Sequence, residues 1–390
     1  MWFFRSPEIV FGEGALDHLA SIQGHRAFIV TDENIVRLGF VETVQAKLAE
    51  AQIESAIFAQ VEPNPSLQTV ARGARAAQAF EPDWIIGLGG GSCMDAAKSV
   101  WIQYERPELE PDNVAPFGRL GLGVKAKMIA IPTTSGTGAE TTWPIVLTDT
   151  EEHCKISVGH PENIPTLAIV DPVFVNHLPP QITADTGMDA LTHAVEGYTS
   201  HWANDFSDGL CVKAAQLIFD YLPRAYQSGA DDPEAREKVH NAATIAGLAF
   251  GNSMAAMAHG LGHSLGALLP IPHGRAVGLC LPYAIEFTVR GWLPTRYAEL
   301  AERLGLPAAA DESEGAAILA EAIRDLARRI QQPTTLEEAG ISREEFEEAL
   351  PKLTDNAVND SAMTINLRFP EEEEVEKVFR YMYEGKPVDF

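Results

Sequence analysis

Cysteine is scarce in this 390-residue chain, and its spacing limits what the thiols can do. The four cysteines are Cys93, Cys154, Cys211 and Cys280, and no two of them form a C-x-x-C pair. Their separation excludes the redox and zinc motifs that depend on such a pair. Scattered cysteines are typical of buried free thiols in a reducing compartment, so we expect a cytoplasmic protein.

Basic side chains and long apolar runs are also scarce. The chain has 29 Lys and Arg against 55 Asp and Glu, a formal net charge of −26, and no visible basic patch, so nucleic acid and anionic membrane surfaces are excluded as partners. Its most apolar stretch, residues 242–258, is interrupted by polar side chains and predicts a buried helix rather than a membrane span. Residues 1–7 lack a basic lead-in and predict a first strand, not a signal peptide.

The length exceeds what one hydrophobic core usually serves, so we expect two domains. In the first part of the chain, short apolar runs alternate with helical patterns. The expected strands cover residues 27–31, 56–61, 84–88, 128–131 and 167–170, and the expected helices cover residues 40–51, 67–79 and 92–103. This alternation predicts a Rossmann-like parallel sheet with helices on both faces.

Helical patterns dominate from about Pro180 to the end of the chain. The expected helices cover residues 186–200, 205–221, 233–267, 293–304, 312–329, 342–353 and 371–384. We therefore predict an α/β domain over residues 1–178, followed by an all-helical domain over residues 179–390.

Three histidines lie within fifteen residues of the helical half. His259 and His263 are four residues apart, so they share one face of a helix. Pro270 and Pro272 interrupt that helix, and we expect His273 on a turn beyond them. The surrounding sequence is apolar, and a buried imidazole needs a partner such as a metal ion or a bound substrate.

A second cluster lies upstream, where Asp189 and His193 are again four residues apart. Taken alone, either pair is more often a hydrogen-bonded part of a core. Two helices that each offer such a pair, together with one histidine from a turn, can surround a divalent ion. The occurrence of both clusters in one chain favours a metal site.

A glycine-rich turn, Gly89-Gly90-Gly91-Ser92, follows an expected strand and opens an expected helix. Such a turn lets the backbone approach a diphosphate, which the N–H groups of the helix N-terminus can bind. Asp32 ends an earlier strand, where a carboxylate can bond a ribose 2′-OH and repel a 2′-phosphate, which favours NAD over NADP. The same residue type also serves as a helix N-cap, so both roles stay open for Asp32.

Four motifs together resemble the iron-containing alcohol dehydrogenase family, also called group III. They are GGGSCMDAAK at residues 89–98, PTTSGTGAE at residues 132–140, GMDALTHAVE at residues 187–196, and a histidine pattern that ends in His-Gly over residues 259–274. The match covers nearly the whole chain. It implies the fold that this family shares with dehydroquinate synthase, a dinucleotide domain followed by an all-helical metal-binding domain.

The resemblance also implies roles for single residues. The metal ligands would be Asp189, His193, His259 and His273. With Asp32 from the argument above, the expected cofactor contacts are Asp32, Asn64, Gly89, Gly90, Gly91, Ser92, Asp95, Thr133, Thr134, Thr137 and Lys155. Asp95 and His263 are the candidate catalytic residues, with His263 near the nicotinamide as a proton relay.

The implied activity is that of a metal-dependent, NAD-linked alcohol dehydrogenase or aldehyde reductase, acting on a small primary alcohol or diol. A divalent metal bound to the hydroxyl lowers its pKa, and the resulting alkoxide gives hydride to the nicotinamide. Three imidazoles and one carboxylate suit Fe²⁺, and they also accept Zn²⁺ or another divalent ion. The resemblance further implies a homodimer, for which a strand from Trp2 to Arg5 is a pairing element.

Other functions stay open at this point. A polyol enzyme of the glycerol dehydrogenase type and a hydroxyacid–oxoacid transhydrogenase are the nearest alternatives. A dehydroquinate synthase-like lyase needs basic groups for a substrate phosphate, and the stretch of residues 254–274 has only Arg275 just beyond it. An NAD-binding regulatory protein would leave the four convergent side chains unexplained.

Overall fold

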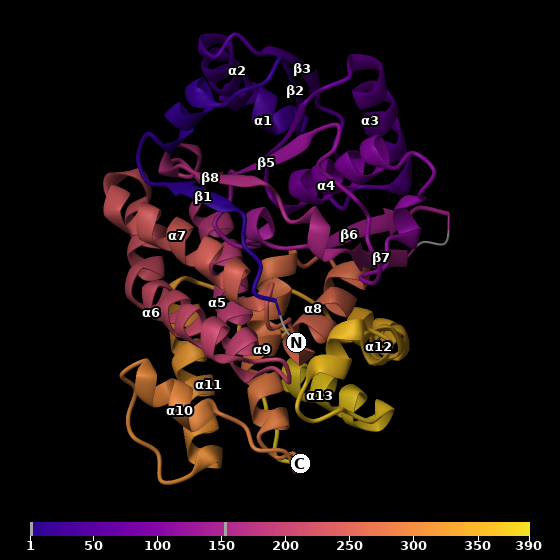
Figure 1. Ribbon diagram of the computed structural model, residues 1–390. Coiled ribbons are helices and arrows are strands. Elements are labelled where there is room, and N and C mark those ends of the chain that lie inside the picture. Colours follow the sequence, from indigo (N-terminus) through magenta and orange to yellow (C-terminus); the bar gives the residue numbers. More distant parts are fainter. Residues whose placement is uncertain (1–2, 152–153) are drawn as a thin grey trace. The chain divides into compact units, whose positions relative to one another are not determined.

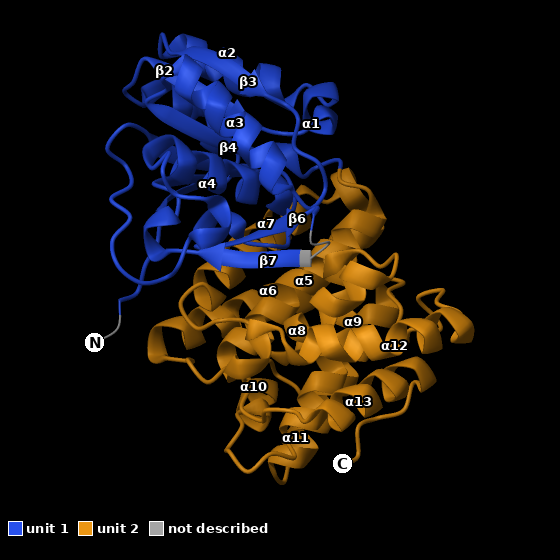
Figure 2. Ribbon diagram, turned by 90° about the vertical axis from the view of Figure 1, so that its right-hand side faces the viewer, with its two compact units in different colours: residues 1–177 blue, residues 178–390 orange. Residues whose placement is uncertain are grey.

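The computed structural model describes residues 3–151 and 154–390. The chain divides into two compact units, residues 1–177 (unit 1) and residues 178–390 (unit 2), which Figure 2 colours separately. Each unit has its own hydrophobic core. The elements of each unit are labelled in Figure 1.

Unit 1 is built on a six-stranded sheet with the strand order β1-β8-β5-β4-β2-β3, and all of its pairs are parallel. The strands are β1 (Glu8–Phe11), β2 (Arg26–Val30), β3 (Glu54–Phe58), β4 (Trp84–Gly89), β5 (Lys127–Pro132) and β8 (Leu167–Val170). The predicted parallel sheet is confirmed. The strand predicted near the N-terminus is wrong for residues 3–5, because the first strand begins after Pro7; Trp2 lies outside the described residues.

Helices cover both faces of this sheet because alternate strand residues point to opposite faces. On β2, Ala27 and Ile29 pack with α1 (Glu33–Arg37) and α2 (Phe40–Glu50). Phe28 and Val30 face the other way, toward α3 and α4. These two helices are α3 (Leu67–Phe80) and α4 (Gly91–Glu105).

Unit 1 also contains an antiparallel hairpin that the sequence patterns did not predict. It pairs β6 (Pro144–Asp149) with β7 (Cys154–Gly159), and Thr148 lies opposite Lys155. The short 3₁₀ helices of the unit are η1 (Ala15–Ser21), η2 (Pro111–Asn113), η3 (Ala139–Thr141), η4 (Pro161–Asn163) and η5 (Pro172–Phe174).

Unit 2 is helical throughout its described elements, as predicted. Its helices are α5 (Pro180–Thr199), α6 (Asp205–Ser228), α7 (Pro233–Phe250), α8 (Met257–Leu268), α9 (His273–Thr288), α10 (Tyr297–Arg303), α11 (Glu312–Arg329), α12 (Arg343–Val358) and α13 (Glu372–Glu384), with η6 (Gly229–Asp231) and η7 (Ser361–Ile365). The single helix predicted over residues 233–267 is wrong. It is divided into α7 and α8 by a turn in which Met254 adopts a left-handed φ of 76°.

Helix α5 is buried along most of its length and lies against α6, α7, α8 and α9. Such close packing requires small side chains where helices meet. A Cβ added at Gly187 would overlap Leu222 of α6, and one added at Gly274 of α9 would overlap the carbonyl oxygen of Asp185. The glycine at position 274 therefore allows the first turn of α9 to lie directly against α5.

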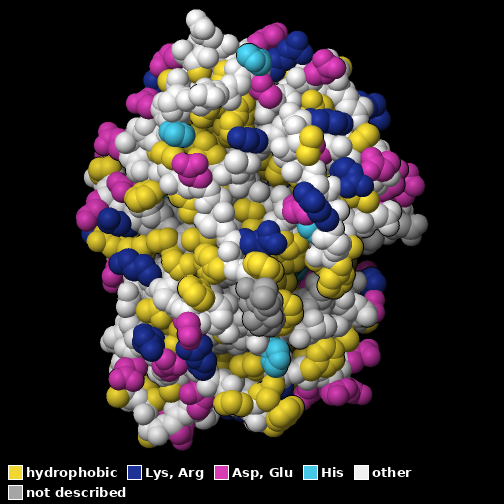
Figure 3. Space-filling model, viewed as in Figure 1, with side chains coloured by type: hydrophobic (Ala, Val, Ile, Leu, Met, Phe, Trp, Pro, Cys, Tyr) yellow, Lys and Arg dark blue, Asp and Glu magenta, His cyan; other side chains and the backbone are white. Residues whose placement is uncertain are grey.

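Three further features concern the helices, the charged surface and the cysteines. No helix in the described part of the chain is both long and apolar enough to cross a membrane. On the face shown in Figure 3, Lys and Arg side chains are dispersed among acidic ones. The thiols of Cys93, Cys211 and Cys280 are free and buried, as expected.

Candidate functional site

Four side chains from three helices of unit 2 converge on one point. Helix α5 carries Asp189 and His193 on one face, α8 carries His259, and α9 begins with His273. Asp189 Oδ1 lies 3.9 Å from His193 Nδ1, 3.8 Å from His259 Nε2 and 3.5 Å from His273 Nε2. The two Nε2 atoms of His193 and His259 are 2.9 Å apart. The structure thus brings together the four side chains named from the resemblance.

The burial and polarity of this group fit a cation. Asp189, His193 and His259 are buried, and one potential ligand atom from each lies within 4.8 Å of the others. Among the described residues, Asp189 Oδ1 has no hydrogen-bond partner, and burial raises the pKa of this carboxyl to about 7. A buried carboxylate oxygen without a hydrogen-bond partner is costly, and a bound divalent ion would remove that cost.

His273 differs from the other three in its setting. Its side chain is 38% exposed, against 2% for Asp189. The expectation that it sits on a turn is wrong, because it is the first residue of α9. Pro272 occupies the N-cap position with a φ of −56°, which suits the start of a helix.

Glu196 is a residue of this site that the sequence analysis quoted in a motif but gave no role. It lies on α5, one turn beyond His193, and its Oε2 is 2.5 Å from Nδ1 of His259. Burial opposes protonation of His259, but the carboxylates of Glu196, Asp189 and Asp360 together outweigh this effect, so the pKa of His259 lies above its ordinary value. The D-x₃-H-x₂-E spacing on one helix was the signal that could have identified Glu196.

Two further residues contact the imidazoles of His263 and His193: Asp360, which was not predicted, and Phe250, which was expected only as an apolar residue of the cleft. Asp360 Oδ2 is 2.9 Å from Nδ1 of His263. Because a carboxylate only accepts, Nδ1 of His263 donates and its Nε2 is the remaining acceptor. Phe250 stacks on His193 with ring centroids 4.0 Å apart and an angle of 8° between the rings.

In unit 1, the glycine turn lies at the carboxyl end of β4 and begins α4. Gly89 has a φ of 147°, which side chains rarely adopt, and a Cβ there would also meet Cys93. The turn packs against the loop after β5, because Thr133 N–H donates to Gly89 O at 3.0 Å. A Cβ on Gly91 would lie 2.9 Å from Thr137, and one on Gly90 would lie 3.4 Å from Thr134. The structure therefore places Gly89, Gly90, Gly91, Thr133, Thr134 and Thr137 together at one edge of the sheet.

Asn64 and Ser92 join this edge of the sheet. The Asn64 N–H donates to Ser92 Oγ at 3.3 Å, and Asn64 has a left-handed φ of 57°. Thr148 Oγ1 donates to Asn64 O at 3.1 Å, and the strand register places Lys155 opposite Thr148. Burial lowers the pKa of Lys155. The hairpin β6–β7 thus brings Lys155 toward the same loops.

Asp32 and Asp95 both have partners within unit 1. Asp32 Oδ1 accepts the N–H groups of Asn34 and Ile35 as the N-cap of α1, and its Oδ2 accepts from the Cys93 thiol at 3.4 Å. Asp95 Oδ2 accepts the N–H of Val146 at 3.0 Å. Burial raises the pKa of Asp95 to about 6, although Lys98 opposes this. Their contacts with a cofactor stay predictions.

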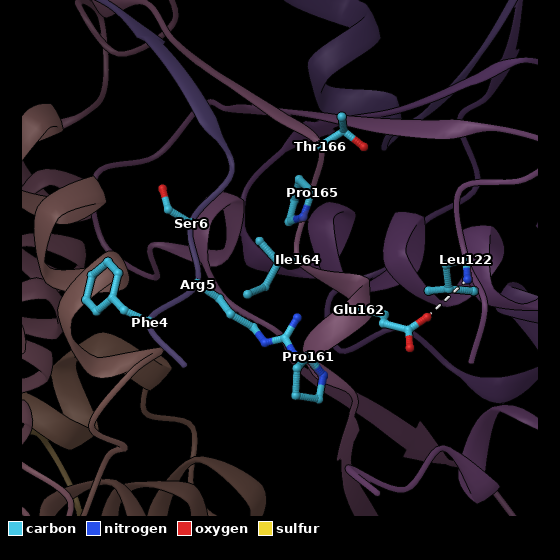
Figure 4. A pocket seen from close by; sticks show the side chains of 9 residues that line it. All are labelled: Phe4, Arg5, Ser6, Leu122, Pro161, Glu162, Ile164, Pro165 and Thr166. Atoms are coloured by element: carbon cyan, nitrogen blue, oxygen red, sulfur yellow. Dashed lines mark hydrogen bonds between the residues drawn. The ribbon is translucent and has the colours of Figure 1, made fainter. Parts of the chain in front are cut away.

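A surface pocket elsewhere in unit 1 is no candidate for the dinucleotide. The residues that line this pocket precede β1, β5 or β8 in the chain. Figure 4 shows them: Phe4, Arg5, Ser6, Leu122, Pro161, Glu162, Ile164, Pro165 and Thr166. Thr166 directly precedes β8, and Glu162 accepts the N–H of Leu122 at 3.2 Å. The pocket therefore lies at the amino ends of β5 and β8. Dinucleotides bind at the carboxyl ends of parallel strands.

The geometry of both units agrees with what is known of related proteins. Residues 6–172 match the family model of iron-containing alcohol dehydrogenase, and residues 183–383 match that of the C-terminal part of the Fe-containing alcohol dehydrogenase family. The chain belongs to the iron-containing alcohol dehydrogenase family. It is an oxidoreductase of the alcohol dehydrogenase type, and membership implies a metal and NAD(P).

Individual relatives in this family cover the chain throughout. The chain is 39% identical over 392 residues to an NADPH-dependent butanol dehydrogenase from Clostridium saccharobutylicum, with all of both chains covered. A solved 1,3-propanediol oxidoreductase is 31% identical, with a TM-score of 0.88 over 98% of this chain and 100% of its own. An aldehyde-alcohol dehydrogenase from Streptococcus pneumoniae serotype 4 is 38% identical over 98% of this chain; the alignment spans only 46% of that relative, so this chain matches about half of its length.

Proposed function

We propose that Asp189, His193, His259 and His273 hold one divalent metal ion, and that the enzyme uses it to interconvert a small primary alcohol or diol and its aldehyde. The observation that carries this proposal is the convergence of the four side chains around Asp189 Oδ1, a buried oxygen with no hydrogen-bond partner among the described residues. Three imidazoles and one carboxylate favour Fe²⁺, and Zn²⁺ is the main alternative.

A residue of unit 2 is placed to accept the proton that leaves the alcohol hydroxyl. A metal ion held by Asp189, His193, His259 and His273 would supply Lewis-acid polarisation of the hydroxyl, and a bound nicotinamide would supply the hydride acceptor. His263 takes the hydroxyl proton at Nε2, because Asp360 engages its Nδ1. The side chain of His263 is 27% exposed, so it can pass the proton on to solvent.

The proposed cofactor is NAD, held by the loops at the carboxyl ends of β2, β3, β4 and β5 and by the β6–β7 hairpin. Its proposed contacts are Asp32, Asn64, Gly89, Gly90, Gly91, Ser92, Asp95, Thr133, Thr134, Thr137 and Lys155. A carboxylate at Asp32 disfavours a 2′-phosphate, which supports NAD although the butanol dehydrogenase above is NADPH-dependent. A direct comparison of the two cofactors is therefore part of the test.

The substrate is proposed to be a short primary alcohol or diol. The names of two relatives, a butanol dehydrogenase and a 1,3-propanediol oxidoreductase, support this class. Glycerol and a hydroxyacid belong in the same assay, because they represent the polyol dehydrogenase and transhydrogenase alternatives.

We further propose a cytoplasmic homodimer. The buried free thiols support a reducing compartment. Strand β1 lies at the edge of the sheet, and an edge strand is a template for pairing with a second copy. Light scattering of the purified protein tests the dimer through its molar mass.

The experiment that tests the function starts from protein freed of metal with a chelator. We expect no NADH formation from alcohols until Fe²⁺ or Zn²⁺ is added back, and faster formation with butanol or 1,3-propanediol than with glycerol. Equal turnover before and after metal removal would show that the metal proposal is wrong. The absence of alcohol-dependent NADH or NADPH formation at any metal loading would contradict the proposed reaction.

A further inference from the structure

The Glu196 carboxylate receives three N–H groups. Its Oε2 accepts the N–H of Ala256 at 3.0 Å and lies 2.5 Å from Nδ1 of His259, while its Oε1 accepts the N–H of Ala258 at 2.5 Å. Glu196 and His259 are both buried. A carboxylate has enough lone pairs to satisfy all three donors.

Two of these donors belong to the amino end of α8. Ala256 occupies the N-cap position of this helix and has no side chain that can accept a hydrogen bond. Glu196, which comes from α5, supplies the missing acceptor. The helix that carries His259 is therefore attached to the helix that carries Asp189 and His193.

We infer that Glu196 is the positioning residue of the metal site: it fixes the ring of His259 and its Nδ1–H tautomer, so that the Nε2 lone pair faces Asp189 and His193. Since the carboxylate accepts, Nδ1 must donate, and Nε2 of the neutral ring is left as the only ligand atom. Carboxylates that hold ligating histidines in this way strengthen metal binding. The inference rests on the metal site proposed above.

The variant Glu196→Gln tests this role at nearly constant volume. An amide oxygen can accept from two of the three donors at most, so the third donor meets the NH₂ group. We expect Zn²⁺ to bind about 10- to 100-fold more weakly than to the wild type. The dissociation constant is measured by competition with a chromophoric chelator at constant pH, on protein first freed of metal.

Glu312→Gln is the matched control. Glu312 also accepts N–H groups at the start of another helix, those of Tyr297 and Ala298, but no candidate ligand is among its partners. We expect this control to bind Zn²⁺ as the wild type does. Equal affinity of Glu196→Gln and the wild type would overturn the inference and leave the metal site standing. A wild type that binds no Zn²⁺ would overturn the metal site itself.

A second measurement needs no variant of Glu196. The ¹⁵N chemical shifts of the His259 ring distinguish its two tautomers in metal-free wild-type protein at alkaline pH, with assignment by loss of the signals in His259→Gln. We expect the Nδ1–H form. An Nε2–H form would overturn the inference, because Glu196 would then not hold Nδ1–H.

Discussion

The Asp32 carboxylate has two kinds of partner in unit 1. Oδ1 caps α1, and Oδ2 accepts the Cys93 thiol. Both contacts hold the charge in place at the carboxyl end of β2. If the ribose of the proposed cofactor binds there, a charge fixed in this way would repel a 2′-phosphate.

Replacing Asp32 by Ala is expected to raise the preference for NADP relative to NAD, because the repulsion disappears. Loss of the N-cap is expected to cost about 1 kcal/mol of stability. The measurement is kcat/KM with each cofactor. Asn204→Ala, which removes the N-cap of α6, serves as control and is expected to leave the preference unchanged. An unchanged ratio for Asp32→Ala would mean that Asp32 is only a cap.

His263 is the second residue with a proposed chemical role. We expect His263→Ala to lower kcat by about 100-fold, because a positioned acid–base group contributes roughly that much. Asp360→Asn keeps the imidazole but weakens the contact with Nδ1, and we expect a smaller loss. The measurement is kcat across a pH series. Full activity of His263→Ala at every pH would contradict the proton relay.

At the scale of elements, the metal site depends on how closely three helices approach one another. Gly274 lies where α9 meets the Asp185 carbonyl of α5, and a Cβ on Gly262 of α8 would lie 2.5 Å from the Val277 side chain of α9. The same approach places His273 at the start of α9 beside Asp189. The small residues at these helix contacts therefore allow the candidate ligand side chains to lie close together.

We expect Gly274→Ala to destabilise the protein by about 1–3 kcal/mol, because an added methyl in a filled contact forces the helices apart. It should also weaken Zn²⁺ binding, since His273 moves with α9. Urea unfolding and chelator competition measure the two effects. Gly209→Ala on α6 is the control: its Cβ meets nothing within 4 Å, and it is expected to stabilise by about 0.5–1 kcal/mol. Wild-type stability and affinity in Gly274→Ala would contradict the account.

The strands of unit 1 were largely predictable from the sequence, whereas one helix boundary of unit 2 was not. Apolar runs located five strands of the sheet; the observed β2 is shifted by one residue from its predicted range, and β4 extends one residue beyond its own. The break between α7 and α8 could not be predicted, because the sequence there stays rich in Ala and Gly while Met254 adopts a left-handed φ. Periodicity reports local pattern, and this break is set by packing.

In the candidate site, too, local spacing was predictable from the sequence and long-range contacts were not. The spacing of four residues correctly placed Asp189 with His193 on one helical face. Glu196 and Asp360 received no role, because their partners His259 and His263 lie 63 and 97 residues away in the sequence. Only the fold brings those side chains together.

At the scale of the whole molecule, stability depends on pH. Part of this dependence comes from a buried histidine, His240, which is not one of the proposed metal ligands. Burial lowers the pKa of His240 on α7 from 6.5 to about 3. The folded state therefore keeps this ring neutral while the unfolded chain protonates it. The associated stability is fully present above pH 6.5 and is lost as the pH falls from 6.5 toward 3.

We expect the unfolding free energy to fall by about 1.4 kcal/mol per pH unit from this one group over the lower part of that range. In His240→Gln, the unfolding free energy should fall less steeply with decreasing pH by that amount, whatever the absolute stability of the variant. Identical slopes in His240→Gln and the wild type would show that His240 does not titrate in this way.

The central claim is that one cation binds at Asp189 and three histidines of unit 2, and its stoichiometry tests this most directly. Metal-free wild type, Asp189→Asn and the control Asp208→Asn are each titrated with Zn²⁺ in a calorimeter; Asp208 is a partly buried aspartate whose Oδ2 lies 2.7 Å from Nη2 of Arg296. The account predicts one tightly bound ion per chain in the wild type and the control, and none in Asp189→Asn. A wild type without a tight site, or an Asp189→Asn variant that binds as the wild type does, would contradict it.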